Sequence, residues 1–229
     1  MKKSNTDFPA RIIFEDNHLL VIDKLSGELA QGDATGDEDL LVKGKRYIGE
    51  KYNKPGNVFL GLPHRLDRPT SGVVILCRTT KALQRVSIAF KERNTDKVYH
   101  CMVEGHLTDQ SAKLVHYLAK NAKNNKSYCV EKSHSKGKEA ALTYTVLRLF
   151  DRYTLLEICL HTGRHHQIRA QLAAIGHCVK GDVKYGARRG NGDGSICLHA
   201  YRLTLKHPVT KDDLRCVSKQ YYLAMWGFI

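Results

Sequence analysis

A charged and turn-rich segment, residues 64–72, runs directly into the continuous apolar run 73–77. An uninterrupted apolar run of this length predicts a buried strand, so the charged segment must lie where that strand begins. Asp67 stands between Arg65 and Arg68, and neighbouring positive charge favours the ionised form of a carboxyl group. An ionised carboxylate in this position can act as a nucleophile or stabilise a cation. A surface ion pair beside a turn is the plainer interpretation of the same pattern.

The balance of charge indicates a polyanionic partner. The 229 residues carry a formal net charge of +14 at pH 7, while the hydrophobic and charged fractions, 42% and 26%, are ordinary for a globular protein. Such an excess of positive charge favours nucleic acid first and an anionic membrane surface second. The basic residues are spread along the whole chain, so we expect a folded surface to contact phosphates.

The sequence disfavours several classes of protein. No run approaches the roughly 18 apolar residues that span a bilayer, and the basic start of the chain lacks the apolar stretch of a signal peptide. We expect residues 1–10 to form a disordered tail. The 7 cysteines are scattered without a C-x-x-C pair, which favours reduced thiols over a disulfide framework. The sequence therefore predicts a cytoplasmic protein.

Hydrophobic periodicity predicts a single α+β domain over residues 11–229, with no internal repeat. Helices are expected at residues 39–52, 79–90 and 165–175, and strands at residues 11–15, 18–23, 73–77, 97–104, 113–119, 128–132, 141–150, 153–160, 196–205 and 212–217. Asp39 and either Thr79 or Thr80 are suitable N-caps for the first two helices, and Gly176 ends the third. The expected architecture is a large mixed, mostly antiparallel sheet with flanking helices.

A second arginine-rich segment, residues 161–169, joins a predicted strand to the third helix. Thr162 is a fair N-cap, and the free N–H groups at the start of the helix, beside Arg164, predict an anion site. Arg169 falls on the flank of the buried stripe of this helix. An arginine in that position needs a buried acidic partner, and Asp67 is the candidate.

Three histidines in this segment, His161, His165 and His166, also suggest a zinc site. This interpretation is weaker, because Gly163 interrupts the helix that would align them and the neighbouring arginines repel a dication. We therefore expect no metal, and we expect His166 to bond the backbone or a phosphate.

Both segments match the motifs of one enzyme family. The family motif H-R-L-D-R-x-T-S-G is matched by residues 64–72, T-G-R-x-H-Q-[IL]-R by residues 162–169, the K-x-Y strand by Lys97 and Tyr99, G-D-x-x-Y-G by residues 181–186, and L-H-A…L…H-P by residues 198–208. On these residues the chain resembles the RluA-type pseudouridine synthases, RNA-modifying enzymes that isomerise uridine in place. The resemblance runs in order from about residue 11 to residue 208.

This resemblance implies roles for individual residues. It implies that Asp67 is the catalytic carboxylate, that Arg169 pairs with it and keeps it ionised, and that Tyr99 lies against the uracil. Without the resemblance, a core tyrosine of a half-buried strand is the plainer interpretation of Tyr99. Ile168 would form part of the apolar wall of the uracil pocket, and Arg65 would help to extrude the base. Phosphate or structural contacts are expected of Arg68, Arg164 and Lys24.

The implied reaction breaks the N1–C1′ bond of uridine, rotates the uracil and joins C5 to C1′, so no cofactor is expected. Ribosomal or transfer RNA is the expected partner, and we expect a monomer. The chain departs from the family pattern at Leu25, where K-P-x-G has proline, and at Pro69, where an aspartate is common. About ten residues precede the first predicted strand, so we expect no S4-like RNA-binding domain.

Two other functions are compatible with parts of this pattern. A catalytically inactive RNA-binding protein would keep the charge but would not need Asp67 or Tyr99, and both are present. A glycoside hydrolase acting on nucleosides or sugars usually needs two carboxylates on one bond, and the motifs offer one.

Overall fold

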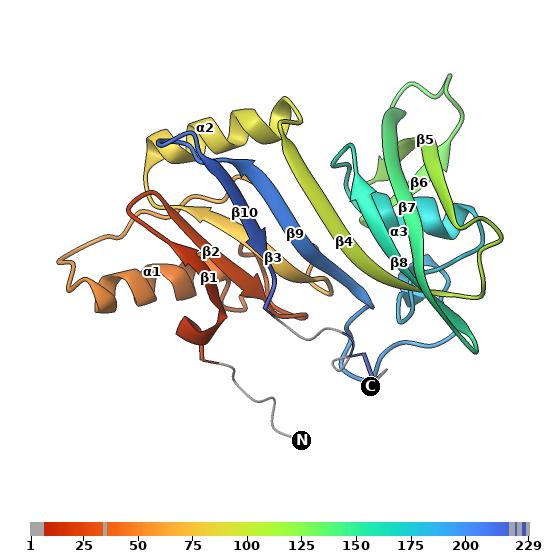
Figure 1. The fold of residues 1–229 in the computed structure, drawn as a ribbon, viewed down its shortest axis with the longest axis horizontal. Coiled ribbons are helices and arrows are strands. Elements are labelled where there is room, and N and C mark those ends of the chain that lie inside the picture. Colours follow the sequence, from red (N-terminus) through yellow and green to blue (C-terminus); the bar gives the residue numbers. More distant parts are fainter. Residues whose placement is uncertain (1–6, 34–35, 220–222, 224–225, 228–229) are drawn as a thin grey trace. The chain divides into compact units, whose positions relative to one another are not determined.

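The computed structural model describes residues 7–33, 36–219, 223, 226 and 227. The chain divides into two compact units, drawn as a ribbon in Figure 1. Unit 1 comprises Met1–Thr95 and Arg202–Ile229, and unit 2 comprises Asp96–Tyr201. Most of the predicted tail, residues 1–6, lies outside the described residues. The described end of the predicted tail enters η1 (Pro9–Arg11), a turn of 3₁₀ helix.

Unit 1 is built around a pair of fully buried strands. Its elements are β1 (Ile12–Glu15), β2 (Leu19–Lys24), α1 (Leu40–Lys51), β3 (Ser71–Cys77), α2 (Thr80–Lys91), β10 (Asp213–Val217) and the later part of β9 (Leu198–Lys206). Strands β1, β2 and β3 pair antiparallel in that order, and β10 pairs antiparallel with β9. Every residue of β2 and β3 is buried, which confirms the buried strand predicted at residues 73–77.

Short polar side chains fix the ends of these elements. The turn between β1 and β2 is held by Asp16, whose Oδ1 accepts hydrogen bonds from two backbone N–H groups at 2.7 Å. Asp39 caps α1 by accepting from the N–H of Val42 at 2.8 Å. Thr79 caps α2 by accepting from the N–H of Ala82 at 3.1 Å. The hairpin and both caps agree with the sequence prediction.

Helix α1 approaches its neighbours closely because residue 44 is glycine. A Cβ atom built on Gly44 would lie 2.8 Å from Leu60 Cδ1 and 3.2 Å from Leu76 Cδ1. A side chain at this position would therefore have to displace the side chains of these leucines.

Unit 2 is an antiparallel sheet with one principal helix. Its elements are β4 (Thr95–Glu104), β5 (Ser111–Asn121), β6 (Lys126–Val130), β7 (Lys138–Phe150), β8 (Tyr153–Leu160), α3 (Gln167–Ala174), η2 (Val183–Tyr185) and the first part of β9. The pairs β4–β8, β8–β7, β7–β5 and β5–β6 are all antiparallel. Helix α3 lies against one face of this sheet (Figure 1). Leu156 and Ile158 are fully buried on β8, as their alternation with Glu157 predicts.

The ten strands follow the order β1-β2-β3-β9-β4-β8-β7-β5-β6, with β10 paired to β9. The α+β class and the large, mostly antiparallel sheet are thereby confirmed. Strand β6 begins two residues earlier than predicted. The polar segment before it closes into a tight turn, in which Asn125 adopts a left-handed φ of 47° and its N–H donates to Ala122 O.

The cysteines behave as small apolar residues. All 7 are free thiols, and four of them are buried. Burial raises the pKa of the Cys77 and Cys216 thiols to about 12, which makes them unreactive at neutral pH. Within the described part of the chain, no helix has the length and apolar character needed to cross a membrane.

The cap of α2 provides a test of the local structure. We expect Thr79→Ala to lower the free energy of unfolding by about 1 kcal/mol, because the N–H of Ala82 loses its acceptor. Thr79→Ser keeps the hydroxyl and should change stability by less than about 0.5 kcal/mol. Urea denaturation of the three proteins measures the difference, and equal stability of the two variants would contradict the cap.

Candidate active site

The motif aspartate lies in a turn whose backbone is fixed. The Asp67 loop, residues 64–70, leads into β3, and the side chain of Asp67 is half-buried. The N–H of Thr70 donates to Asp67 O at 3.0 Å, which closes the turn. The hydroxyl of Ser26 donates to Pro69 O at 2.7 Å and ties the turn to the segment that follows β2. The Asp67 carboxylate therefore extends from a backbone with little freedom to move.

A buried lysine provides the strongest tie to this loop. Lys24, the last residue of β2, is 0% exposed. Its Nζ donates to three carbonyl oxygens, those of Leu25 at 3.0 Å, Arg68 at 3.1 Å and Thr70 at 2.6 Å. An ammonium group has three N–H donors, so these acceptors match its full capacity. Of the two roles predicted for Lys24, burial favours the structural one.

The Asp67 carboxylate stabilises the charged form of Lys24. Burial lowers the pKa of Lys24 to about 7. The negative charges of Glu28 and Asp67 act in the opposite direction and raise the pKa of Lys24. The ammonium thus interacts electrostatically with Asp67 from inside the fold. The sequence pattern indicates only the two arginines that flank Asp67 along the chain as sources of positive charge.

Those flanking arginines have exposed side chains. Arg68 donates from Nε to Gly27 O at 3.2 Å and forms an ion pair with Asp37 at 2.5 Å, in which both side chains are largely exposed.

His64, the first residue of the Asp67 loop, is held by a buried strand and a helix. His64 Nε2 accepts from the N–H of Ile75 at 3.0 Å, and its ring stacks on Phe90 with 4.6 Å between centroids.

In unit 2, Arg169 belongs to a buried cluster that also contains Asp182, Tyr185 and His166, hereafter the Arg169 cluster. Arg169 is 4% exposed and donates from Nε and Nη2 to the two oxygens of Asp182 at 2.6 and 2.8 Å. Its guanidinium lies 5.0 Å from the centroid of the Tyr185 ring. A bidentate pair of this kind fixes the plane of the guanidinium as well as its position.

Asp182 is the acidic partner that the sequence prediction misses. The prediction required a buried acid for Arg169 and proposed Asp67, whose pairing with Arg169 stays a prediction. The signal for Asp182 is present in the sequence, because it is the only acid in the matched G-D-x-x-Y-G motif. Nothing local in that motif, however, indicates which basic residue it faces.

The start of α3 differs from the prediction. Thr162 is not its N-cap, because the helix begins only at Gln167, after His166 in a left-handed conformation with φ 53°. Thr162 instead accepts from the N–H of Ala141 at 2.9 Å and donates to Gln167 Oε1 at 2.7 Å. The same Oε1 accepts from the N–H of Arg164 at 2.9 Å, so that N–H is already bonded within the protein.

The remaining basic residues of this segment bond separate partners. Arg164 Nε donates to Glu139 O at 2.9 Å. The histidine contacts are His161 Nε2 with Thr143 Oγ1 at 2.8 Å, His165 Nδ1 with Ser127 Oγ at 2.9 Å, and His166 Nδ1 with Tyr185 OH at 3.0 Å. The described residues include no group of three or more His, Cys, Asp or Glu side chains that could hold a metal ion.

Tyr99 and Ile168 meet at one apolar cluster of unit 2. Tyr99 lies on β4 opposite Ile158 of β8, and it packs, partly buried, against the cluster that contains Ile168. Ile168 is 5% exposed and follows directly on Gln167 in α3. The structure therefore brings the predicted tyrosine and the predicted apolar wall residue to the same core.

Comparison with known proteins identifies the family. The family model described as RNA pseudouridylate synthase matches residues 18–174, which is more than half of the chain. The chain belongs to this family. The resemblance to RluA-type enzymes drawn from the motifs is confirmed.

Curated relatives match most of this chain. An uncharacterized RNA pseudouridine synthase of Aquifex aeolicus is 32% identical over 88% of this chain and 66% of its own length. A ribosomal large subunit pseudouridine synthase C of Vibrio cholerae is 31% identical over 89% of this chain and 63% of its own length. The chain thus spans a little under two thirds of these two relatives.

A solved structure supports the fold. Human RNA Pseudouridylate Synthase Domain Containing 4 superposes with a TM-score of 0.75 and 23% identity, over 95% of this chain and 91% of its own. At that identity the likeness concerns the fold alone.

The depressed pKa of Lys24 predicts a pH effect on stability. We expect Lys24 to titrate near pH 7 in the folded protein, whereas an unfolded lysine titrates near pH ~10.4. Between these values the folded chain binds fewer protons than the unfolded chain, so this group makes stability rise as pH increases from 7. Titration of ¹³Cε-labelled lysines by NMR measures the pKa directly. A Lys24 pKa close to the ordinary lysine value of ~10.4 would refute it.

The buried ion pair of Arg169 predicts a large stability effect. We expect Asp182→Ala to lower the free energy of unfolding by about 3–5 kcal/mol, because it removes the carboxylate that accepts two hydrogen bonds from the buried guanidinium. Asp213→Ala is the matched control, since its pair with Lys206 is exposed, and it should change stability by less than about 1 kcal/mol. Urea denaturation compares the two, and equal losses would contradict a structural role for Asp182.

Proposed function

We propose that this protein is an RNA pseudouridine synthase, an isomerase that converts specific uridines of an RNA to pseudouridine. One observation carries the proposal: the family match over residues 18–174 includes Asp67, Tyr99 and Arg169, and each stands in its family motif. The fixed Asp67 loop and the buried Arg169 cluster support it, because catalysis requires charged groups held in place before the substrate binds.

The reaction conserves atoms and electrons. The N1–C1′ bond breaks, the uracil rotates, C5 bonds to C1′, and the proton leaving C5 is balanced by protonation at N1. Positive charge develops at the sugar as the glycosidic bond breaks, and an ionised carboxylate is suited to stabilise or attack that centre. We assign this role to Asp67, with Lys24 fixing the loop from beneath.

The remaining residues prepare and position the substrate. Arg169 supports the ionised form of Asp67, while Tyr99 and Ile168 contact the extruded uracil. The exposed Arg65 occupies the space that the extruded base leaves in the RNA, and stacking of its guanidinium offsets part of the few kcal/mol that flipping costs.

The other motif side chains differ in what they can offer to phosphates. Arg68 is exposed, and its ion pair with Asp37 is exposed as well, so the guanidinium can exchange this partner for a phosphate. Arg164 and His166 already bond groups within unit 2, which favours a structural contribution from both.

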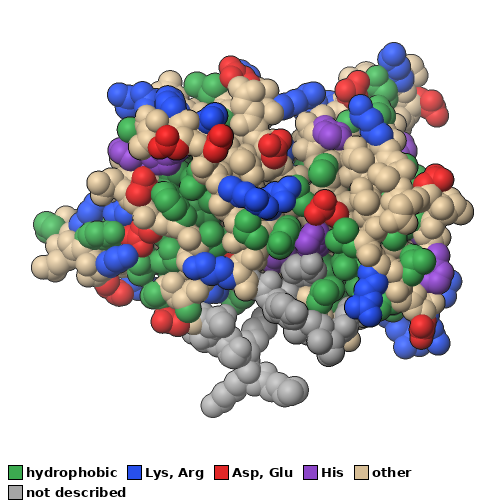
Figure 2. All heavy atoms as spheres, viewed as in Figure 1, with side chains coloured by type: hydrophobic (Ala, Val, Ile, Leu, Met, Phe, Trp, Pro, Cys, Tyr) green, Lys and Arg blue, Asp and Glu red, His purple; other side chains and the backbone are tan. Residues whose placement is uncertain are grey.

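We propose RNA as the partner because of the formal net charge of +14. Lys and Arg side chains are interspersed with acidic ones on the face drawn in Figure 2, so phosphate contacts should come from several places. Ribosomal and transfer RNA are the two substrates to test, and some relatives are named for the ribosomal large subunit. We propose that residues 11–229 act as one catalytic domain, because the family match runs through both units. We also propose that the protein acts as a monomer in the cytoplasm.

The activity can be tested on RNA from a strain that lacks the gene. We expect the purified protein to restore pseudouridine at specific positions, mapped by carbodiimide treatment and primer extension. RNA binding without any restored position would indicate an inactive binding protein. Release of free uracil would indicate a hydrolase.

Asp67 is the decisive residue for this proposal. We expect Asp67→Asn to abolish pseudouridine formation while RNA affinity stays within about twofold, because the substitution removes the charge and keeps the shape. Asp37→Asn is the control, since it removes an exposed carboxylate that pairs with Arg68, and it should retain activity. Turnover of Asp67→Asn above a few per cent of wild type would overturn the assignment.

A further inference from the structure

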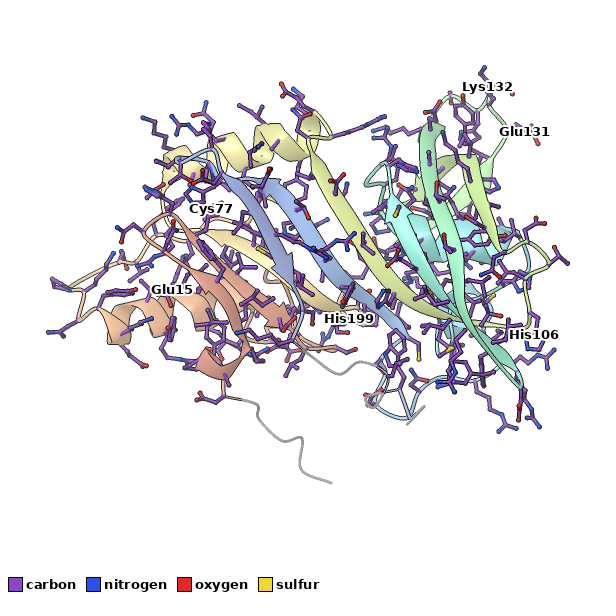
Figure 3. The ribbon with its side chains drawn as sticks, in the orientation of Figure 1. Glu15, Cys77, His106, Glu131, Lys132 and His199 are labelled. Carbon is purple, nitrogen blue, oxygen red and sulfur yellow. The ribbon has the colours of Figure 1, made fainter. Side chains whose placement is uncertain are left out.

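The β5–β6 hairpin of unit 2 carries no acidic residue. Residues 111–130 contain Lys113, Lys120, Lys123 and Lys126 but no Asp or Glu. Among the described residues, none of these lysines forms a salt bridge. The next acid is Glu131, whose side chain lies with that of Lys132 at the outer end of this part of the sheet (Figure 3). The hairpin itself thus carries a net positive charge, and the adjoining strand β7 places one acid, Glu139, opposite Tyr117.

The two faces of the hairpin differ. Leu118 and Cys129 lie opposite each other on the inner face and pack with the residues of α3. The alternation of strand residues places a second set on the outer face, hereafter the hairpin face: Lys113, Val115 and Tyr117 of β5, with Lys126 and Tyr128 of β6. Val115 is 51% exposed and Tyr128 39% exposed, so this face presents apolar and aromatic surface to solvent.

The tyrosines of the hairpin face are arranged as a platform. Tyr117 lies opposite Val130, and Tyr128 lies opposite Ala119. The two tyrosines are therefore diagonal neighbours, a relation in which residues of adjacent strands are generally spaced roughly 7–8 Å apart along the sheet surface. The hydroxyl of Tyr128 accepts from Asn124 Nδ2 at 2.6 Å, which orients the ring at the sheet surface. Aromatic rings on an open sheet, bordered by lysines, are the usual means of binding single-stranded nucleic acid.

One residue connects this hairpin to the Arg169 cluster. The backbone N–H of Ser127 donates to Tyr185 OH at 2.9 Å, and Tyr185 OH donates to Ser127 O at 3.1 Å. The neighbouring Lys126 Nζ lies 4.8 Å from the Tyr185 ring centroid and 5.2 Å from that of Tyr128. The hairpin face is therefore held at a fixed distance from the residue pair Arg169–Asp182.

We propose that the hairpin face binds a single-stranded stretch of the substrate RNA next to the target uridine, with phosphates on its lysines and bases stacked on Tyr128 and Tyr117. This inference rests on the proposed function and names the surface through which that function selects its substrate. A different role for the lysines is protection of β6, an edge strand, from pairing with another chain. That role accounts for the charge but gives no reason for an exposed tyrosine and valine beside it.

Charge neutralisation tests the phosphate contacts. The double variant Lys113→Gln, Lys126→Gln is compared with Lys54→Gln, Lys81→Gln, which removes the same charge from exposed positions of unit 1. The probe is a fluorescent oligoribonucleotide of 20 uridines, titrated at several salt concentrations. We expect the hairpin variant alone to lower the slope of log affinity against log salt by about 1.4, at roughly 0.7 per phosphate contact. Equal slopes for the two variants would overturn the proposal.

Replacement of the exposed tyrosine tests the stacking contact. We expect Tyr128→Ala to weaken binding of the same probe by about fivefold or more, the range of one lost base–aromatic stack. Tyr128→Phe retains the ring and should bind within about twofold of wild type. If Tyr128→Ala binds the probe as tightly as wild type does, the proposal fails.

These results are separable from the proposed function. Loss of probe binding in the hairpin variants, with no pseudouridine formed by the wild-type protein in any RNA, would uphold the surface and remove the isomerase. Normal pseudouridine formation by wild type, with hairpin variants that bind and react as the unit 1 control does, would uphold the isomerase and remove the surface.

Discussion

The environment of Asp67 depends on a lysine that never reaches solvent. Lys24 donates to the carbonyl oxygens of Arg68 and Thr70 and so fixes the turn on either side of Pro69. Burial of an ammonium is unfavourable unless its donors are satisfied, and here three carbonyl oxygens satisfy them. The cost shows in the pKa of Lys24, which burial lowers to about 7. Burial therefore lowers the pKa of Lys24, while the hydrogen bonds of the same side chain hold the Asp67 loop.

The buried cation of unit 2, Arg169, has a different kind of hydrogen-bond acceptor from Lys24. Arg169 meets a carboxylate, Asp182, through two charge-assisted hydrogen bonds, and a ring, Tyr185, covers part of its plane. A guanidinium suits this arrangement because its fork matches the two oxygens of a carboxylate, which an ammonium cannot do. Both units thus hold a buried positive charge next to a motif that the family shares. The acceptors for Lys24 are backbone carbonyl oxygens of unit 1, and an acceptor for Arg169 is the Asp182 carboxylate of unit 2.

The Arg169 cluster also connects the buried and exposed parts of unit 2. Tyr185 contacts Arg169 through its ring and Ser127 through its hydroxyl, and Ser127 lies between two residues of the hairpin face. A chain of packed groups therefore leads from the outer sheet surface to the ion pair. His166, held in a left-handed conformation, completes it by bonding the same hydroxyl. An RNA strand on the hairpin face would meet a surface with fixed geometry relative to Arg169.

Local sequence determined much of this protein. Periodicity and short-range polar contacts identified the strands, the helices and the caps Asp39 and Thr79, because such features depend on residues a few positions apart. The motifs identified the family, since two long segments matched in order. Only the tertiary structure decided that Asp182 binds Arg169, that Lys24 holds the Asp67 loop, and that Thr162 bonds Gln167 rather than capping α3. These choices depend on register and packing between segments far apart in the chain, which no local pattern specifies.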